Sequence, residues 1–299
     1  MKIHVYIFIS ICIFLFLSSK VYAEKPQKVV IGTYIINIGK YDISTGSYTA
    51  DFYLWFKWNG TISPEKFEFM NGRANKITTL IDQPGYKFYR VEAQFYTNSQ
   101  LRNYPIDHHD LFISIEDQVL TTKDMIYIPD YSESDINPNL SIIGWEIIHS
   151  NISVSTDYYK NWDESYSNYV HKITISRPVS TMLKTLIPII FIALTAWLCF
   201  FIPLHKFGEK LALGGTSLLS AVAFHIYITS SLPAVGYLTL ADKLIIALYA
   251  MLVTILIGMI KVENYVNNKK IDQAQRRNEI YKIISLIIPI IALSMLLFL

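Results

Sequence analysis

The fold is decided by residues 208–226, which read GEKLALGGTSLLSAVAFHI. The stretch is long enough to span a bilayer, yet it carries a charged start, glycines, hydroxyls and a histidine. Polar groups are costly in hydrocarbon, so in membrane helices they normally face a bundle interior or water. At helical spacing one stripe holds a carboxylate, then small and hydroxyl side chains, then bulky aliphatic ones. These are Glu209, Ala212, Thr216, Leu219, Ala223, Ile226 and Ser230.

Several copies of this stripe around one axis predict an ion pore. They would form a charged ring, a polar ring and a hydrophobic constriction, which are the parts that a selective and gated pore needs. The alternative is a polar helix buried inside a single-chain bundle. The stripe alone leaves both interpretations open, since matches to a motif or a period also arise by chance.

Three more hydrophobic stretches surround this one after Arg177-Pro178. Each is near the roughly 20 residues that a spanning helix needs. We expect a membrane domain over residues 178–299, with helices at about 178–203, 209–231, 239–263 and 279–299. Lys and Arg gather after the first helix and around the link between the third and fourth, whereas the link 233–239 carries none. The positive-inside rule therefore places that link, the preceding domain and the C-terminus on the outer side of the membrane.

The N-terminus is typical of a secretory signal. Lys2 precedes the apolar run Val5–Leu17, and small residues follow before Glu24. We expect residues 1–23 to be a signal peptide, and the alternative is an uncleaved anchor helix. Under both interpretations the chain that follows is exported.

Residues 24–177 have the β-branched, aromatic and alternating pattern of strands, with turn residues between the runs. Many short strands at regular spacing predict an all-β, immunoglobulin-like sandwich. The region holds 14 Lys and Arg against 19 Asp and Glu, so this outer domain is acidic. The clearest expected strands are 29–36, 48–58, 87–95, 111–115 and 171–175.

Several other functions lack support in the sequence. Cys12 and Cys199 both lie in hydrophobic segments, so no disulfide framework is available. No basic, aromatic-interleaved patch suggests nucleic-acid binding. No nucleophile–base set, metal-ligand cluster or phosphate loop is present, so we expect no enzyme, catalytic residue, cofactor or metal. His108 and His109 are adjacent on an expected strand, where they would point to opposite faces.

Five passages, in order along the chain, resemble the pentameric ligand-gated ion channels of the Cys-loop receptor superfamily. Residues 52–60, FYLWFKWNG, are similar to the second strand of that family, and 101–107, LRNYPID, to its aromatic-Pro-x-Asp loop. Ile175–Pro178 resembles the junction into the first helix, and Pro188 resembles the proline inside that helix. Residues 208–233 resemble the whole pore helix of a cation-selective member. The order and the topology carry the resemblance, because each passage alone is a weak signal.

Two departures from the animal members resemble the prokaryotic branch. Thr97 and Leu111 stand where a pair of cysteines would bracket the aromatic-Pro-x-Asp loop, so the loop disulfide is missing. The last link, about 264–279, is too short for a separate cytoplasmic domain. The resemblance implies a homopentamer in a bacterial inner membrane, in contact with lipid and permeable to monovalent cations.

The resemblance also implies roles along the stripe. A ring of Glu209 carboxylates favours cations; the alternative is a carboxylate that complements the helix dipole. Thr216 would offer hydroxyls to the ion, and Ala212 stands where a small polar group is frequent. Leu219, Ala223 and Ile226 would form a gate that stops ions by dewetting, unless they simply pack between helices. His225, beside the stripe, is better interpreted as a hydrogen-bonded contact between helices than as a proton sensor.

Coupling between the two halves should pass through the junction. Asp107 and Arg177 resemble a buried acid and base of the family, and a purely structural salt bridge is the alternative. Pro105 is a candidate cis-proline. The expected coupling residues are Asp42, Tyr104, Pro105, Asp107, Arg177, Pro233 and Tyr237.

A ligand site is expected between subunits. Residues 155–166 match the family's capping loop, and aromatic faces attract ammonium groups. Residues 117–119 lie where another loop of the site is expected but lack its aromatic residue, which argues against a typical quaternary-amine site. Packing is the alternative role for these aromatics. The expected ligand-binding residues are Tyr53, which would face the site from the neighbouring subunit, and Tyr158, Tyr159, Trp162 and Tyr166.

Three functions follow from these observations. The first is a cation-selective pentameric channel opened by an external small ligand or by protons. The second is a receptor of the same fold that binds a ligand without conducting. The third, a membrane enzyme, has no chemical motif to support it. Glu209 and the hydroxyls of the stripe favour the first, because a receptor that does not conduct needs neither.

Overall fold

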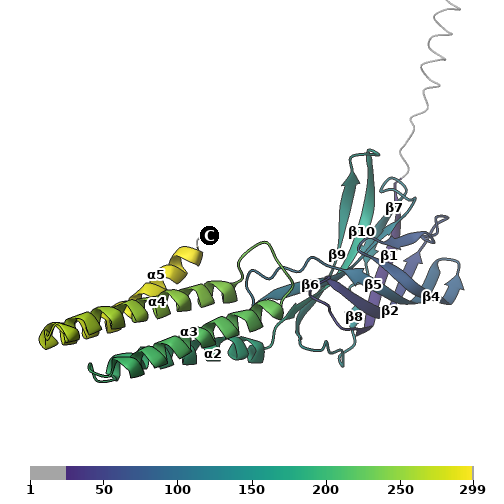
Figure 1. The fold of residues 1–299 in the computed structure, drawn as a ribbon. Helices are drawn as coiled ribbons and strands as arrows, with labels where there is room; N and C mark the ends of the chain where they lie inside the picture. Colours follow the sequence, from purple (N-terminus) through teal and green to yellow (C-terminus); the bar gives the residue numbers. More distant parts are fainter. Residues whose placement is uncertain (1–24, 298–299) are drawn as a thin grey trace, which may run out of the picture.

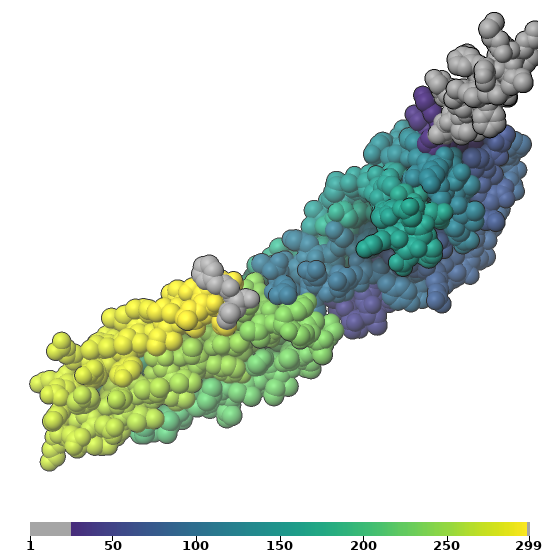
Figure 2. Space-filling view, turned by 90° about the horizontal axis from the view of Figure 1, so that it is seen from above, coloured from purple at the N-terminus to yellow at the C-terminus, as the bar shows by residue number. Residues whose placement is uncertain are grey.

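A computed structural model describes residues 25–297. A domain of strands is followed by a bundle of long helices, and the two lie end to end (Figure 1). The space-filling view shows the elongated shape that results, with the strand domain at one end and the helices at the other (Figure 2). The expected signal peptide, residues 1–23, lies outside the described residues.

The strand domain consists of two sheets. The larger has the order β4-β5-β2-β1-β7, with β8 paired to β1, and the smaller has the order β3-β6-β10-β9. In the larger sheet the strands are β1 (Gln27–Ile38), β2 (Ser47–Trp58), β4 (Gly72–Gln83), β5 (Tyr86–Tyr96), β7 (Met125–Pro129) and β8 (Asp135–Ile136). In the smaller sheet they are β3 (Phe67–Phe69), β6 (His108–Asp117), β9 (Glu146–Tyr159) and β10 (Glu164–Ser176).

Alternating side chains from both sheets form the core. Phe52, Leu54 and Phe56 of β2 are fully buried, and Ile113 and Ile115 of β6 meet them in one cluster. Two sheets packed through such inward-facing residues make a β-sandwich, so the expected fold class is confirmed.

All five strands listed from the sequence lie within strands of the structure, but β4 and β9 are longer elements that the sequence pattern did not predict. Almost every residue of β4 is exposed or half-exposed, because this strand forms the edge of its sheet. A strand that buries neither face has no alternating hydrophobic pattern to detect.

Four helices follow that are long and apolar enough to cross a membrane. They are α2 (Val179–Trp197), continued by the 3₁₀ turn η1 (Leu198–Phe201), α3 (Phe207–Ser230), α4 (Leu240–Asn267) and α5 (Ile271–Leu297). Among the described helices α4 is central, since it packs against α2, α3 and α5.

The last helix begins earlier than expected, at Ile271 rather than near residue 279. Its polar first turns are rich in Gln, Arg and Glu, which are good helix formers even where they bury nothing. The link between α4 and α5 therefore shrinks from about 264–279 to residues 268–270. With 28 residues, α4 is roughly 42 Å long, so it exceeds the roughly 30 Å thickness of a hydrocarbon core.

Candidate functional site

The stripe singled out in the sequence forms one continuous exposed face of α3. All seven of its residues, from Glu209 to Ser230, are exposed on the subunit surface. Leu219 is 71% exposed and Ile226 64% exposed. Large aliphatic side chains in such positions indicate a face that another surface covers or that lines a space.

The opposite face of α3 holds the helix in the bundle. Its buried residues are Lys210, Gly214, Ser217, Ala221 and Ile228. A Cβ atom on Gly214 would lie 2.6 Å from Cε of Met259 on α4, so glycine is what permits the close approach of the two helices. The sequence therefore gives α3 one packed face and one free face, and the polar stripe is the free one.

The two charged residues at the start of α3 point in different directions. Glu209 is exposed and pairs with Lys206 at 2.7 Å. Lys210 is only 2% exposed, and its Nζ donates to Oδ1 of Asn278 on α5 at 3.3 Å. The carboxylate thus lies on the free face, while the neighbouring ammonium group is directed into the bundle. The sequence alone did not identify Asn278 as the partner of Lys210.

The hydroxyl of Thr216 is oriented by its own helix. Oγ1 donates to the carbonyl oxygens of Ala212 at 2.9 Å and Leu213 at 3.0 Å. Because the proton is directed at the backbone, the oxygen lone pairs are free to accept from the exposed side. Such an oxygen is suited to contact a cation.

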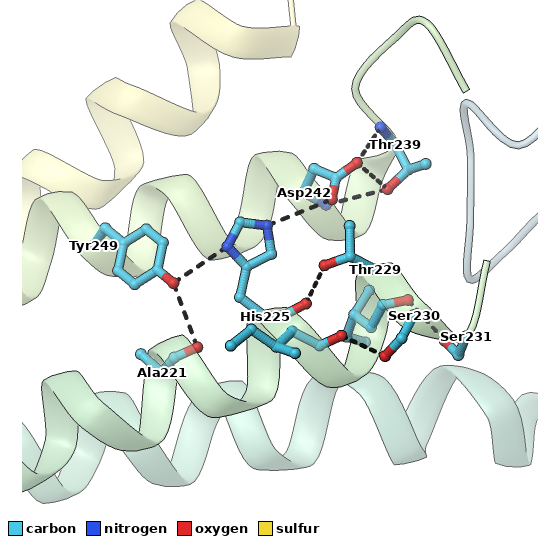
Figure 3. Close-up of polar contacts among 10 residues, drawn as sticks. Ala221, His225, Thr229, Ser230, Ser231, Thr239, Asp242 and Tyr249 are labelled. Atoms are coloured by element: carbon cyan, nitrogen blue, oxygen red, sulfur yellow. Dashed lines mark hydrogen bonds and ion pairs between the residues drawn. The ribbon is translucent and has the colours of Figure 1, made fainter. Parts of the chain in front are cut away.

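His225 does not belong to the exposed stripe but bridges α3 and α4 (Figure 3). Its Nδ1 lies 3.2 Å from the hydroxyl of Tyr249, and its Nε2 lies 4.0 Å from Oδ1 of Asp242. Asp242 in turn caps the start of α4 with Thr239 in a reciprocal capping box. The histidine therefore makes the contact between helices that was expected of it.

The predicted acid and base meet where the sandwich joins the helices. Nε of Arg177 donates to Oδ1 of Asp107 at 2.6 Å, and Nε2 of His109 lies 2.6 Å from Oδ2 of the same carboxylate. Asp107 is 1% exposed. Burial opposes its ionisation, but the hydrogen bond from His109 and the charge of Arg177 outweigh this and lower the pKa of the carboxyl. His108, by contrast, is exposed, so the two histidines do point to opposite faces.

The aromatic-Pro-x-Asp loop contacts the link between α3 and α4 directly. The backbone N–H of Leu240 donates to the carbonyl of Arg102 at 2.8 Å, and that of Ala241 to the carbonyl of Tyr104 at 3.0 Å. The hydroxyl of Tyr237 accepts from the N–H of Leu101 at 2.9 Å. The Arg102 guanidinium also lies 4.5 Å from the Tyr237 ring. Four contacts thus connect the loop to the link and to the first residues of α4.

The remaining expected coupling residues differ in their placement. The Tyr104–Pro105 peptide bond is cis, as expected. Asp42 is half-exposed, and its carboxylate accepts hydrogen bonds from Ser44 within its own hairpin. Hydrogen bonds of Asp42 lower the pKa of this carboxyl, but over residues 25–297 no ion pair links it to Arg177. Pro233 is half-buried in the link.

Three of the expected ligand-binding aromatics line one pocket beneath the hairpin of β9 and β10. Its volume is about 390 Å³, and Tyr159, Trp162 and Tyr166 form its aromatic side. The Tyr159 ring lies 5.7 Å from the Trp162 ring and 5.6 Å from the Tyr166 ring. The pocket is also lined by residues that the sequence did not single out as ligands, Glu68, Met70, Glu116, Asp117, Gln118 and Glu164.

The other two aromatics lie elsewhere. Tyr158 is 60% exposed, and its hydroxyl donates to Asp163 on the outside of the hairpin. Tyr53 stacks on Phe88 with the ring centroids 5.2 Å apart on the larger sheet. Neither lines the pocket within one subunit, so Tyr53 can reach such a site only from a neighbouring subunit, as the resemblance implies.

Two of the four acidic side chains of the pocket are buried, unlike most carboxylates. Glu116 and Asp117 are each 2% exposed. Burial raises the pKa of both carboxyls, that of Glu116 to about 7, although the Tyr159 hydroxyl donates to Oε2 of Glu116 at 2.9 Å. A signal was present in the sequence, since Glu116-Asp117 directly follows the mostly apolar run 111–115, LFISI. Over the described chain, no cluster of His, Cys, Asp and Glu has the geometry of a metal site.

Comparison with known proteins adds independent information. Residues 185–295 match the family of the neurotransmitter-gated ion-channel transmembrane region. The chain is 21% identical to a proton-gated ion channel of Gloeobacter violaceus over 254 residues, which cover 76% of this chain and 70% of that protein.

Two receptor subunits of animals are also similar. One is the gamma-aminobutyric acid receptor subunit beta-4 of Gallus gallus, 23% identical over 48% of this chain and 29% of that subunit. The other is the gamma-aminobutyric acid receptor subunit beta of Caenorhabditis elegans, 23% identical over 51% of this chain and 28% of that subunit. The matches span less than a third of the length of each subunit.

Proposed function

The chain belongs to the Cys-loop-type ligand-gated ion channels, a non-enzymatic family of integral membrane proteins, and from this premise we propose that it forms a cation-selective homopentamer. The observation that carries the proposal is the exposed face of α3, which presents Glu209 while Lys210 turns into the bundle. Five such faces around one axis would make the lining of a pore. Their inner ring would then carry the Glu209 carboxylates, each beside the exposed Lys206 but with the Lys210 ammonium group turned into the bundle. Rings of carboxylates favour cations.

The rest of the face supports a gated pore. Thr216 would supply oxygen atoms to a partly dehydrated monovalent cation. Leu219, Ala223 and Ile226 would form the hydrophobic constriction, which stops ions by dewetting when the pore is narrow. Ala212, one turn before Thr216 on α3, has no polar side-chain atom. Between Glu209 and Leu219, Thr216 would therefore form the one ring of hydroxyls on the stripe.

Opening would be driven from the sandwich, on the outer side of a bacterial inner membrane. An acidic outer domain raises the local concentration of cations by electrostatic focusing. We propose that a small cationic ligand binds in the pocket of Tyr159, Trp162 and Tyr166, since aromatic faces and carboxylates both attract ammonium groups. Movement there would reach α3 through the loop that contacts Tyr237 and Leu240.

Current across planar bilayers tests this proposal. The purified full-length protein is inserted under a salt gradient, the outer pH is stepped from 7 to 4, and small primary amines are added in a separate series. Cation-selective current in either series supports a channel and distinguishes acid from ligand as the trigger. Silence in both, from a preparation whose mass confirms a pentamer and which binds amines, would instead favour the receptor that does not conduct.

A further inference from the structure

The floor of the pocket beneath β9 and β10 holds a carboxylate with an unpartnered oxygen. Oε2 of Glu116 accepts from the Tyr159 hydroxyl, but Oε1 is buried without a hydrogen-bond partner among the described residues. Oδ2 of Asp117, which lines the same pocket, is also buried without a hydrogen-bond partner in that part of the chain. Buried acceptors without a donor are rare and costly, so two of them in one pocket indicate a place prepared for a group that is not part of the chain.

The charges around Glu116 are almost all negative. Glu68 on β3 is its direct partner in the sheet register, and Asp157 on β9 acts on it electrostatically. Lys66, which precedes β3, influences Asp117, but no ion pair to Glu116 occurs within residues 25–297. The titratable groups around the Glu116 carboxylate are Glu68, Asp117, Tyr127, Asp157, Tyr159, Glu164 and Tyr166.

Within residues 25–297, an ionised Glu116 carboxylate has no positively charged partner in an ion pair. Burial raises the pKa of Glu116 to about 7, the Tyr159 hydrogen bond opposes that rise, and the negative charges of Asp157 and Glu68 add to it. Residues 25–297 place no cation in an ion pair with Glu116, whereas a ligand with an ammonium group would supply both the charge and N–H donors for Oε1. The same oxygen is equally able to take a proton.

We propose that a proton and the cationic ligand compete for the Glu116 carboxylate, so that acid weakens ligand binding at this pocket. The inference rests on the ligand site of the proposed function and adds its regulation. Acid therefore opposes the ligand, which is the reverse of what a proton that opens the channel does. The two effects of pH are separable because one concerns binding in the sandwich and the other concerns current.

Calorimetric titration of the full-length protein in detergent with propylamine tests the competition. An alkylammonium stays protonated from pH 6 to 8, as the side chain of Lys does, so a change in affinity over this range reports on the protein. Competition at a group whose pKa is about 7 predicts that the apparent dissociation constant rises about tenfold from pH 8 to pH 6.

Glu116→Gln keeps the shape of the side chain and removes its titration. We expect this variant to bind propylamine weakly and with no pH dependence between 6 and 8. Asp110→Asn is the control, because Asp110 lies on the same strand as Glu116 but is exposed, lies outside the pocket and pairs with Lys172 on the surface. The control should keep the tenfold change.

A second variant keeps the inference testable if Glu116→Gln fails to fold. Tyr159→Phe removes the hydroxyl that stabilises the ionised Glu116, so the midpoint of the pH dependence should move to higher pH. Propylamine affinity that is the same at pH 6 and 8 in the unaltered protein would overturn the competition and leave the ligand site standing. Absence of propylamine binding at every pH would overturn the ligand site as well.

Discussion

Arg177 and Asp107, 70 positions apart in the chain, are joined by a bond of 2.6 Å from Nε to Oδ1 at the junction of sandwich and helices. The guanidinium of Arg177 also lies 4.8 Å from the Tyr104 ring and 4.6 Å from the Trp145 ring. Tyr104 in turn accepts the backbone N–H of Ala241. The pair therefore connects the last strand, the aromatic-Pro-x-Asp loop and the start of α4 in one contiguous set of contacts.

Asp107→Asn should uncouple ligand binding from current. The amide keeps the size of the side chain but leaves the Arg177 charge uncompensated, and breaking a buried pair costs about 3–5 kcal/mol. We expect a pentamer that binds ligand and carries little current, as measured by calorimetry and by bilayer recording of one preparation. Asp110→Asn is the control, since Asp110 is exposed and pairs with Lys172 on the surface. A variant that fails to assemble would mean that the pair is purely structural.

Glu209→Ala should weaken the preference for cations over anions. Each carboxylate removed changes the energy of a monovalent ion about 4 Å away by about 1 kcal/mol in an aqueous pore, which corresponds to about fivefold in the permeability of that ion. The reversal potential in a salt gradient should therefore move toward zero. Glu279→Gln, on the exposed surface of α5, should leave it in place. An unchanged reversal potential in Glu209→Ala would exclude the proposed carboxylate ring.

Leu219→Ser should make opening easier. A ring of hydroxyls wets more readily than a ring of leucines, so less ligand is needed to open the pore. If the closed state is destabilised by about 1.4 kcal/mol, the ligand concentration for half-maximal current falls about tenfold. Dose–response recording measures the shift. Ile290→Ser on α5 is a control with similar exposure, 68% against 71%. If both variants respond alike, Leu219 is an ordinary packing residue and no gate.

Acid should destabilise the sandwich through His171. This residue is 1% exposed between Thr33 and Ser150, and burial lowers its pKa to about 4. An unfolded chain binds the proton near pH 6.5 and the folded one only near pH 4. The contribution of neutral His171 to the free energy of unfolding is therefore fully present above about pH 6.5. It is lost as the pH falls toward 4, by about 3 kcal/mol in total.

The melting temperature of the full-length protein, followed from pH 7 to pH 4.5, measures this loss. His171→Gln keeps hydrogen-bonding capacity on both sides and does not titrate, so its melting temperature should fall less steeply. Parallel falls in the two proteins would assign the acid effect to other groups.

The features that the sequence predicted share a regular period or a distinctive residue. The exposed stripe of α3 follows from helical spacing, and strand β2 from alternation. Asp107 and Arg177 were expected to pair because residues 101–107 and 175–178 resemble the corresponding motifs of the channel family. These signals are local in the chain, and the structure brings the acid and the base together as expected.

The features that were missed depend on contacts between distant segments. Glu116 and Asp117 look like an ordinary strand end until β9 and β10 cover them. Edge strand β4 buries too little to show a pattern, and the first turns of α5 are polar yet helical. Asp42, an expected coupling residue, accepts hydrogen bonds from Ser44 within its own hairpin, which the sequence analysis did not predict.

The three-residue turn between α4 and α5 has a practical consequence. Residues 268–270 are exposed, and Lys269 has a φ of 57°, which a glycine would adopt without strain. Exposed tips between stable elements tolerate inserted domains well. A fluorescent protein joined there through glycine-rich linkers would leave both helices intact and would report the subunit's position in a living cell.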